Sequence, residues 1–336
     1  TLDLKNLKNN LHKNEVFFAY THYGSHIAQY CTTRNYHYKS LKEIDTSQLG
    51  NSINNLKVSV SNPSTPYKYE DANTIYKTYF SLLDKCVKHD SQFVTILADP
   101  EIISIPINSL VVYNNSGDRK WFFEKYKYTL LPSPNYFFIS PARVMPRTEY
   151  LGIGDPILSK KTKIDLNLSI DNLLVTRGVA KYDSIKNIPS LPETYDEIIN
   201  TSKLFSRKKL LLKEKATEKN LRRLMLDDYK IIHFATHGLT SKSHNNLSLP
   251  GLIMTPVIDG PWFNDGYLDS NEIMQFSLSA NLVILSACNT GIDKTQIFKQ
   301  GFSDLTQSFL IAGAKNVLAT QWSIPSKETQ SLINKI

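Results

Sequence analysis

The sequence has very little cysteine, with only Cys31, Cys86 and Cys288 among 336 residues. An odd number of widely separated cysteines argues against a disulfide framework and against a CxxC zinc site, and it fits a reducing cytoplasm. The chain also lacks any run of about 18 apolar residues, and its start, TLDLKNLKNNLHKNE, lacks the apolar core of a signal peptide. We therefore expect a cytoplasmic protein that neither spans a membrane nor is secreted.

Signals for metal, nucleotide and nucleic-acid binding are equally scarce. Four histidines of the N-terminal half stand at no metal-ligand spacing: His22, His26, His37 and His89. Gly152 and Gly154 follow a predicted strand but lack the third glycine and the helix of a dinucleotide-binding loop. The net charge of +8 is spread along the chain without a module of basic and aromatic residues, so direct nucleic-acid binding is not expected. No metal or cofactor is expected either.

The length of 336 residues allows two ordinary units, each with its own core. Near the N-terminus, two β-rich runs around Gly24 predict a hairpin. Apolar residues at helical spacing predict a helix over residues 71–90, with Cys86 in the core. Strand-like segments separated by turn residues follow. We predict one mixed α/β unit over residues 1–145 and a second unit over residues 146–336.

The second half alternates strands with helices. Four strands are predicted within residues 149–156, 229–238, 281–291 and 314–325. Helices are predicted between them, the clearest over residues 191–205 and 300–313. This order is typical of a mainly parallel sheet covered on both faces, in which functional groups follow the C-terminal ends of the strands.

His237 and Cys288 each stand where one of these buried strands ends, in HFATHG and LSACNTG. Neighbouring ends of parallel strands meet at one edge of a sheet, where an imidazole can take the proton of a thiol and create the reactive thiolate. The backbone N–H groups of Gly238 and Cys288 would stabilise a developing oxyanion. A lone cysteine after an apolar strand is more often a small buried hydrophobe, so the argument depends on the pair. His233 lies inside its strand and is predicted to be a packed core residue.

Four segments resemble the CHAT domain family, caspase-like peptidases often found attached to tetratricopeptide repeats: IIHFATHG, DGYLDSNEI, LVILSACNTG and FLIAGAKNVLATQWSIP. The resemblance is specific over residues 216–325 and looser upstream. It implies a caspase-like α/β/α sandwich with a mainly parallel sheet, made of an inactive N-terminal half and an active C-terminal half. By position it implies His237 as general base and Cys288 as nucleophile. One departure is Gly301-Phe302, where family members commonly have Gly-Glu; it leaves these site residues unaffected.

The resemblance also implies the residues that line the primary specificity pocket: Ser286, Trp322 and Ser323. The small hydroxyl side chain of Ser286 would neither neutralise a basic P1 residue nor pair with an acidic one. An apolar or medium-sized P1 residue would follow. Three loop acids would overturn this preference if they reached the pocket: Asp259, Asp265 and Asp293.

We therefore predict a cysteine endopeptidase that cleaves a protein substrate through an acyl-enzyme. The resemblance implies activation by a partner or sensor, and regulated roles such as bacterial defence or programmed death. The expected partners are a protein substrate and a regulatory protein or tetratricopeptide-repeat region. The alternative is a catalytically silent caspase-like scaffold or adaptor, but such proteins usually lose one member of the dyad, and this sequence retains both. The sequence ends at Ile336 midway through a predicted helix, so a fragment or separate chain of a larger protein is expected.

Overall fold

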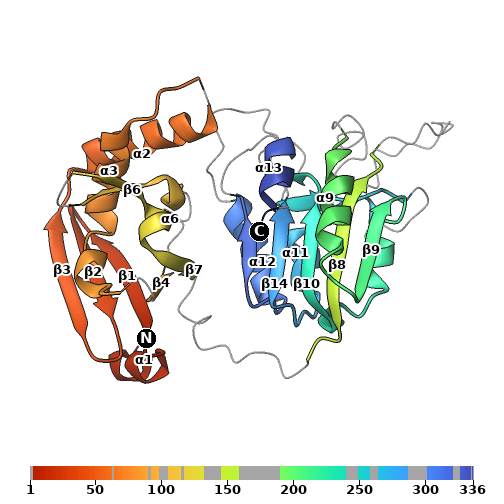
Figure 1. Ribbon diagram of the computed structural model, residues 1–336, viewed down its shortest axis with the longest axis horizontal. Coiled ribbons are helices and arrows are strands. Elements are labelled where there is room, and N and C mark those ends of the chain that lie inside the picture. The colour runs from red at the N-terminus through yellow and green to blue at the C-terminus, as the bar shows by residue number, and fades with distance from the viewer. Residues whose placement is uncertain are drawn as a thin grey trace. The chain divides into compact units, whose positions relative to one another are not determined.

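The chain forms two compact units, Thr1–Ser140 and Pro141–Ile336 (Figure 1). The computed structural model describes residues 3–62, 64–89, 92–97, 105–114, 117–131, 145–158, 190–239, 249–257, 264–286, 301–320, 326–333 and 335, without the side chains of residues 301–304 and 326–329. Each unit has its own five-stranded sheet. Within the described residues, no helix combines the length and the apolar composition needed to cross a membrane.

Unit 1 is built on a mixed sheet in the order β3-β2-β1-β4-β7. Its strands are β1 (Glu15–Tyr23), β2 (His26–Thr32), β3 (His37–Glu43), β4 (Phe93–Leu97) and β7 (Lys127–Leu131), with a small separate pair, β5 (Val111–Tyr113) and β6 (Arg119–Trp121). Its helices are α1 (Leu4–Asn10), α2 (Thr46–Ser61), α3 (Tyr69–Tyr79), α4 (Leu83–Cys86), the 3-10 turn η1 (Ile107–Ser109) and α6 (Phe122–Lys125). The first three strands are antiparallel, whereas β1, β4 and β7 are parallel.

The predicted hairpin around Gly24 is confirmed as β1 and β2, with Gly24 at a φ of +58° in the turn. Alternate residues of β1 enter the core of unit 1, and Phe18 contacts the ring of Phe80 at a centroid distance of 5.9 Å. The helix predicted over residues 71–90 is shorter than expected. It divides into α3 and α4, because α3 ends at Phe80, whose N–H donates to the Tyr76 carbonyl.

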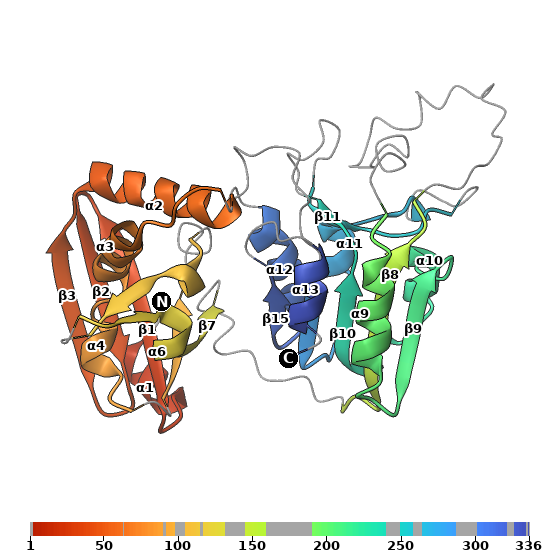
Figure 2. The same ribbon diagram turned by 45° about the horizontal axis from the view of Figure 1, so that its top comes forward.

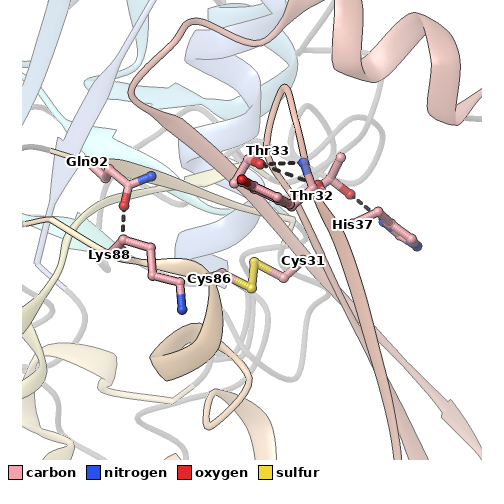
Figure 3. Close-up of a disulfide and its surroundings, with 8 residues drawn as sticks. Cys31, Thr32, Thr33, His37, Cys86, Lys88 and Gln92 are labelled. Atoms are coloured by element: carbon pink, nitrogen blue, oxygen red, sulfur yellow. Dashed lines mark hydrogen bonds between the residues drawn. A yellow bond between two sulfur atoms is a disulfide. The ribbon is translucent and has the colours of Figure 1, made fainter.

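A disulfide joins Cys31 and Cys86 inside this core (Figure 3). The sequence argument against disulfides is therefore wrong for this pair. Its premise was their distance in sequence, but β2 and α4 bring together two residues that are 55 positions apart. Cys86 is buried in the core, as predicted.

Unit 2 contains an entirely parallel sheet in the order β15-β14-β10-β8-β9. Its strands are β8 (Thr148–Pro156), β9 (Lys208–Lys213), β10 (Tyr229–Ala235), β14 (Leu282–Ser286) and β15 (Val317–Ala319). A three-stranded antiparallel sheet is made of β11 (Gly238–Leu239), β12 (Gly251–Ile253) and β13 (Tyr267–Asp269). The helices are α9 (Glu193–Ser202), α10 (Glu218–Arg222), the 3-10 turn η3 (Leu226–Asp228), α11 (Ser270–Met274), α12 (Gly301–Ile311) and α13 (Ser326–Ile333).

Helices cover both faces of the parallel sheet (Figure 2). On β10, the ring of Phe234 contacts Phe309 of α12 at a centroid distance of 5.4 Å, whereas the neighbouring His233 meets Glu197 of α9 on the opposite face. The predicted parallel sheet with helices on both sides is thus confirmed for this unit.

Gly152 and Gly154 of β8 have a packing role. A side chain at either position would overlap with Ile198 of α9. These two glycines let the helix approach the sheet closely, which explains the motif that resembles part of a nucleotide loop.

Candidate active site

His237 follows the C-terminal end of β10 and is almost completely buried, with 1 % of its surface exposed. Its backbone is held by β12, because the Ile253 N–H donates to the His237 carbonyl at 2.9 Å. Ile253 makes a second hydrogen bond to this segment, because the Thr236 hydroxyl donates to the Ile253 carbonyl at 2.6 Å. The backbone at His237 is therefore fixed from two sides, by the parallel sheet before it and the antiparallel sheet after it.

Gly238 pairs with Leu252 where β11 meets β12. Residues 237 and 253 form the hydrogen-bonded pair next to it, and such pairs alternate along an antiparallel ladder. The N–H of Gly238 consequently points away from β12. Such an N–H can donate to a group outside the ladder.

Ser286 is the last residue of β14, and it is buried. In the parallel pairing of β10 with β14, its partner position is Ala235. The two neighbouring strands thus end level with each other, at the same edge of the sheet. Five of the other predicted site and loop residues lie outside the described residues: Cys288, Trp322, Ser323, Asp259 and Asp293.

His233, the second histidine of β10, is a core residue, as predicted, with none of its surface exposed. Its Nε2 lies 2.9 Å from Glu197 Oε1, and its Nδ1 lies 2.8 Å from the Tyr150 hydroxyl. Both ring nitrogens therefore have buried partners, on α9 and β8. The bond to Glu197 connects α9 to the sheet, and the two bonds together give the imidazole a structural role.

A cluster of two buried acids, Glu218 and Glu272, and the half-buried Asp265 supports the antiparallel sheet next to His237. Glu218 of α10 accepts a hydrogen bond from the Gly266 N–H at 2.9 Å, just before β13. Arg222 binds Glu272 of α11 at 2.7 Å, and Asp265 accepts from the Tyr267 N–H at 2.8 Å. Asp265 is thus engaged in this local network. Apart from Asp265, no sequence signal marked the cluster, since its members come from separate elements.

Helix α11 begins with a reciprocal capping arrangement. The Asp269 side chain accepts from the Glu272 N–H, and the Glu272 side chain accepts from the Asp269 N–H. The segment DGYLDSNEI offers two candidate caps for this helix, Asp269 and Ser270, and the structure uses Asp269. The cap holds the end of β13, which pairs with β12 and so stabilises the strand that holds His237.

Burial raises the pKa of three of these carboxyls. It raises the pKa of Glu218 to about 9, helped by the nearby Glu272 and Asp265, and the pKa of Glu272 to about 7. Burial likewise raises the pKa of Asp265 to about 7. Because the folded chain keeps these protons at pH values where the unfolded chain has released them, folding is favoured at low pH and loses free energy as the pH rises.

We expect the free energy of unfolding to fall between about pH 5 and pH 9. Each of these carboxyls contributes up to about 1.4 kcal/mol for each pH unit between its unfolded and its folded pKa. Glu218→Gln keeps an acceptor for the Gly266 N–H but carries no charge. This variant should flatten the decline, most visibly between pH 7 and pH 9. Urea unfolding at pH 5, 7 and 9, followed by circular dichroism, measures the effect.

The control for this experiment is Glu214→Gln, which removes a carboxylate from an exposed position of the same unit. This variant should follow the pH dependence of the parent chain. A Glu218→Gln chain whose unfolding free energy falls as steeply as the parent's would contradict the assignment.

Comparison with known proteins gives one family match. A model of the CHAT domain matches residues 69–336, which is well over half of the chain, from the start of α3 in unit 1 to the end of unit 2. The matched region includes His237, Gly238, Ser286 and the parallel sheet that carries them. No curated protein matches the chain significantly.

Proposed function

The chain belongs to the CHAT domain family of caspase-like cysteine peptidases, and from this premise we propose that it is a cysteine endopeptidase with Cys288 as nucleophile and His237 as general base. In this proposal residues 1–145 form a caspase-like half without an active site, and residues 146–336 form the active half. The substrate is a protein, and no metal or cofactor takes part in the reaction.

One observation carries the choice of residues. Ala235 of β10 and Ser286 of β14 are partner positions in the sheet, and the proposed base and nucleophile each follow one of them by two residues. Parallel neighbouring strands present their next residues at the same edge. This register supports an imidazole and a thiol that face one substrate.

The proposed chemistry needs a thiolate. His237 accepts the proton of Cys288, and the thiolate attacks the scissile carbonyl carbon. The tetrahedral intermediate collapses to an acyl-enzyme while His237 gives its proton to the leaving amine. A water molecule, deprotonated by His237, then attacks the acyl-enzyme and releases the acid and the free thiol.

The backbone suits the oxyanion of this reaction. The N–H of Gly238 points away from β12, which supports a role for it, with the N–H of Cys288, in an oxyanion hole. Ser286, Trp322 and Ser323 would line the primary pocket. Asp265 already accepts a hydrogen bond from the Tyr267 N–H, and the proposal keeps an apolar or medium-sized P1 residue.

The burial of His237 supports regulation of the site. With 1 % of its surface exposed, this residue leaves little room for a substrate backbone in the described state. We propose that a regulatory partner or sensor opens the site, as a protease that acts inside a cell requires restraint.

The experiment is active-site labelling of the full chain. The probe is a peptide electrophile that forms a thioether with an active thiolate, and it is applied with and without co-expressed neighbouring gene products. The mass of the chain should increase by that of one probe molecule, bound at Cys288. The same addition should be lost in His237→Ala. A peptide library, read by mass spectrometry of new N-termini, then identifies the cleaved bonds and the P1 residue.

The opposite result separates the two functions considered. A chain that captures partner proteins, cleaves none of them and takes up no more electrophile than the His237→Ala variant would favour the scaffold or adaptor function. Labelling at Cys288 that does not depend on His237 would overturn the dyad.

A further inference from the structure

Unit 1 contains a thiol site of its own, separate from the proposed nucleophile. Cys31 lies on β2 and Cys86 is the last residue of α4, and their Cα atoms are 6.5 Å apart, within the range that disulfides span. Figure 3 shows the bond between the strand and the helix end. The pairing leaves Cys288 as the third cysteine of the chain.

The bond is enclosed by the core. Cys31 has none of its surface exposed and Cys86 has 2 % exposed, and both belong to the core that contains Phe18 and Tyr79. Thiol–disulfide exchange requires a thiolate to reach one of the two sulfur atoms. Reduction of this bond therefore requires that unit 1 open locally first.

Hydrogen-bonded turns follow both cysteines. After Cys31, the Tyr36 N–H donates to the Thr33 hydroxyl at 2.9 Å. After Cys86, the Gln92 side chain accepts from the Lys88 N–H at 2.6 Å (Figure 3). These bonds lie within the turn after each cysteine and do not involve sulfur.

The bond also connects a part of unit 1 that precedes the CHAT match with a part that lies inside the match. Cys31 lies before residue 69, where the family match begins, and Cys86 lies within the match. The disulfide encloses β3, α2 and α3 in one covalent loop. The N-terminal hairpin is thus tied covalently to the family domain.

From these observations we infer that Cys31 and Cys86 form a redox modification site, a reversible thiol–disulfide pair whose oxidised form clamps the N-terminal hairpin to α4. The reductant is a protein dithiol. Its first thiolate attacks one sulfur of the pair, which gives a mixed disulfide and releases the other cysteine, protonated by solvent. Its second thiol then displaces the remaining cysteine, so two electrons and two protons reach the pair and the dithiol becomes a disulfide.

The test counts thiols in the full chain. The protein is equilibrated with mixtures of oxidised and reduced dithiothreitol, quenched with acid, unfolded in guanidinium, alkylated with N-ethylmaleimide and weighed. At the oxidising end we expect one maleimide, on Cys288, and a tryptic peptide pair that contains Cys31 and Cys86. At the reducing end we expect three. Three maleimides at every mixture, or a disulfide that includes Cys288, would overturn the inference.

The rate of disulfide reduction and the thermal stability of unit 1 provide a second test. Dithiothreitol should open the bond in the folded chain at least about 100-fold more slowly than in the urea-unfolded chain, because the sulfurs are enclosed. The oxidised chain should have a Tm for unit 1 that is roughly 10 °C above that of the reduced chain. Cys288→Ser, the matched control, should keep this shift, and Cys86→Ser should abolish it. Equal rates in folded and unfolded chains, or a shift that survives in Cys86→Ser, would also overturn the inference.

Discussion

Cys288→Ala and His237→Ala should each lower kcat/KM for a cleaved peptide by roughly 10⁴-fold or more, in any preparation in which the parent chain cleaves it. Alanine at position 288 removes the atom that forms the acyl-enzyme, and alanine at position 237 leaves the thiol without a base. Cleavage followed by mass spectrometry measures both losses. The two effects should not add in the double variant, since both residues act in the same step.

Two controls make this result specific. His89→Ala changes an exposed histidine of unit 1 and should leave the cleavage rate unchanged. Added imidazole should restore part of the activity of His237→Ala but none of that of Cys288→Ala, because only a base can be supplied from solution. Cleavage that persists in either purified single variant would refute the assignment of the dyad.

His233 cannot serve as such a control. Both of its ring nitrogens bind buried partners, Glu197 and Tyr150, so its removal leaves a buried carboxyl and a buried hydroxyl unpaired. Loss of activity in a His233 variant would therefore report on folding and would carry no information about the reaction.

Among the glycines of unit 2 in the described part of the chain, we expect Gly313 to be the one whose replacement by alanine is most destabilising. Gly313 ends the turn after α12 at a φ of +111°, which side chains rarely adopt, and a Cβ atom there would overlap with the backbone carbonyl of Leu278. The loop around Leu278 cannot move aside easily, because the Leu278 N–H donates to Ala312 at 2.7 Å. We expect a loss of about 3 to 5 kcal/mol in the free energy of unfolding.

Gly24→Ala is the matched control for this prediction. Gly24 also has a positive φ, +58°, but a Cβ atom there meets no atom within 4 Å. Its replacement should cost about 1 kcal/mol, from backbone strain alone. Urea unfolding of both variants, with hydrogen exchange to identify the affected unit, measures the difference. Equal losses would show that the overlap with Leu278 has no energetic consequence.

The strands that lead to the proposed site could be predicted because their signals are local. β10 and β14 are short apolar runs with polar and glycine residues after them, and the capping residue Asp269 marks the start of α11. The family motifs lie on these same segments. What these patterns do not contain is the register of β10 with β14, since pairing between strands about 50 residues apart depends on the packing of the whole unit.

The elements that escaped prediction lack a clear apolar period. α2 buries four residues, Leu49, Ser52, Leu56 and Ser59, and half of them are serine, so the helical spacing is invisible in hydropathy. β3 is an edge strand without a buried residue. The disulfide was missed for a different reason, because only the fold determines which distant cysteines meet.

The short ladder of β11 with β12 has a consequence for protein engineering. Leu239 and Gly251 are partner positions, so the eleven residues between them in the sequence, 240–250, join the sheet at a fixed pair of backbone positions. A designer can exchange or lengthen the sequence between these two positions and keep the same attachment points, and Leu239 follows the proposed base by only two positions. Grafted segments from other peptidases at this place would offer a route to new cleavage preferences without any change in the strands of the core.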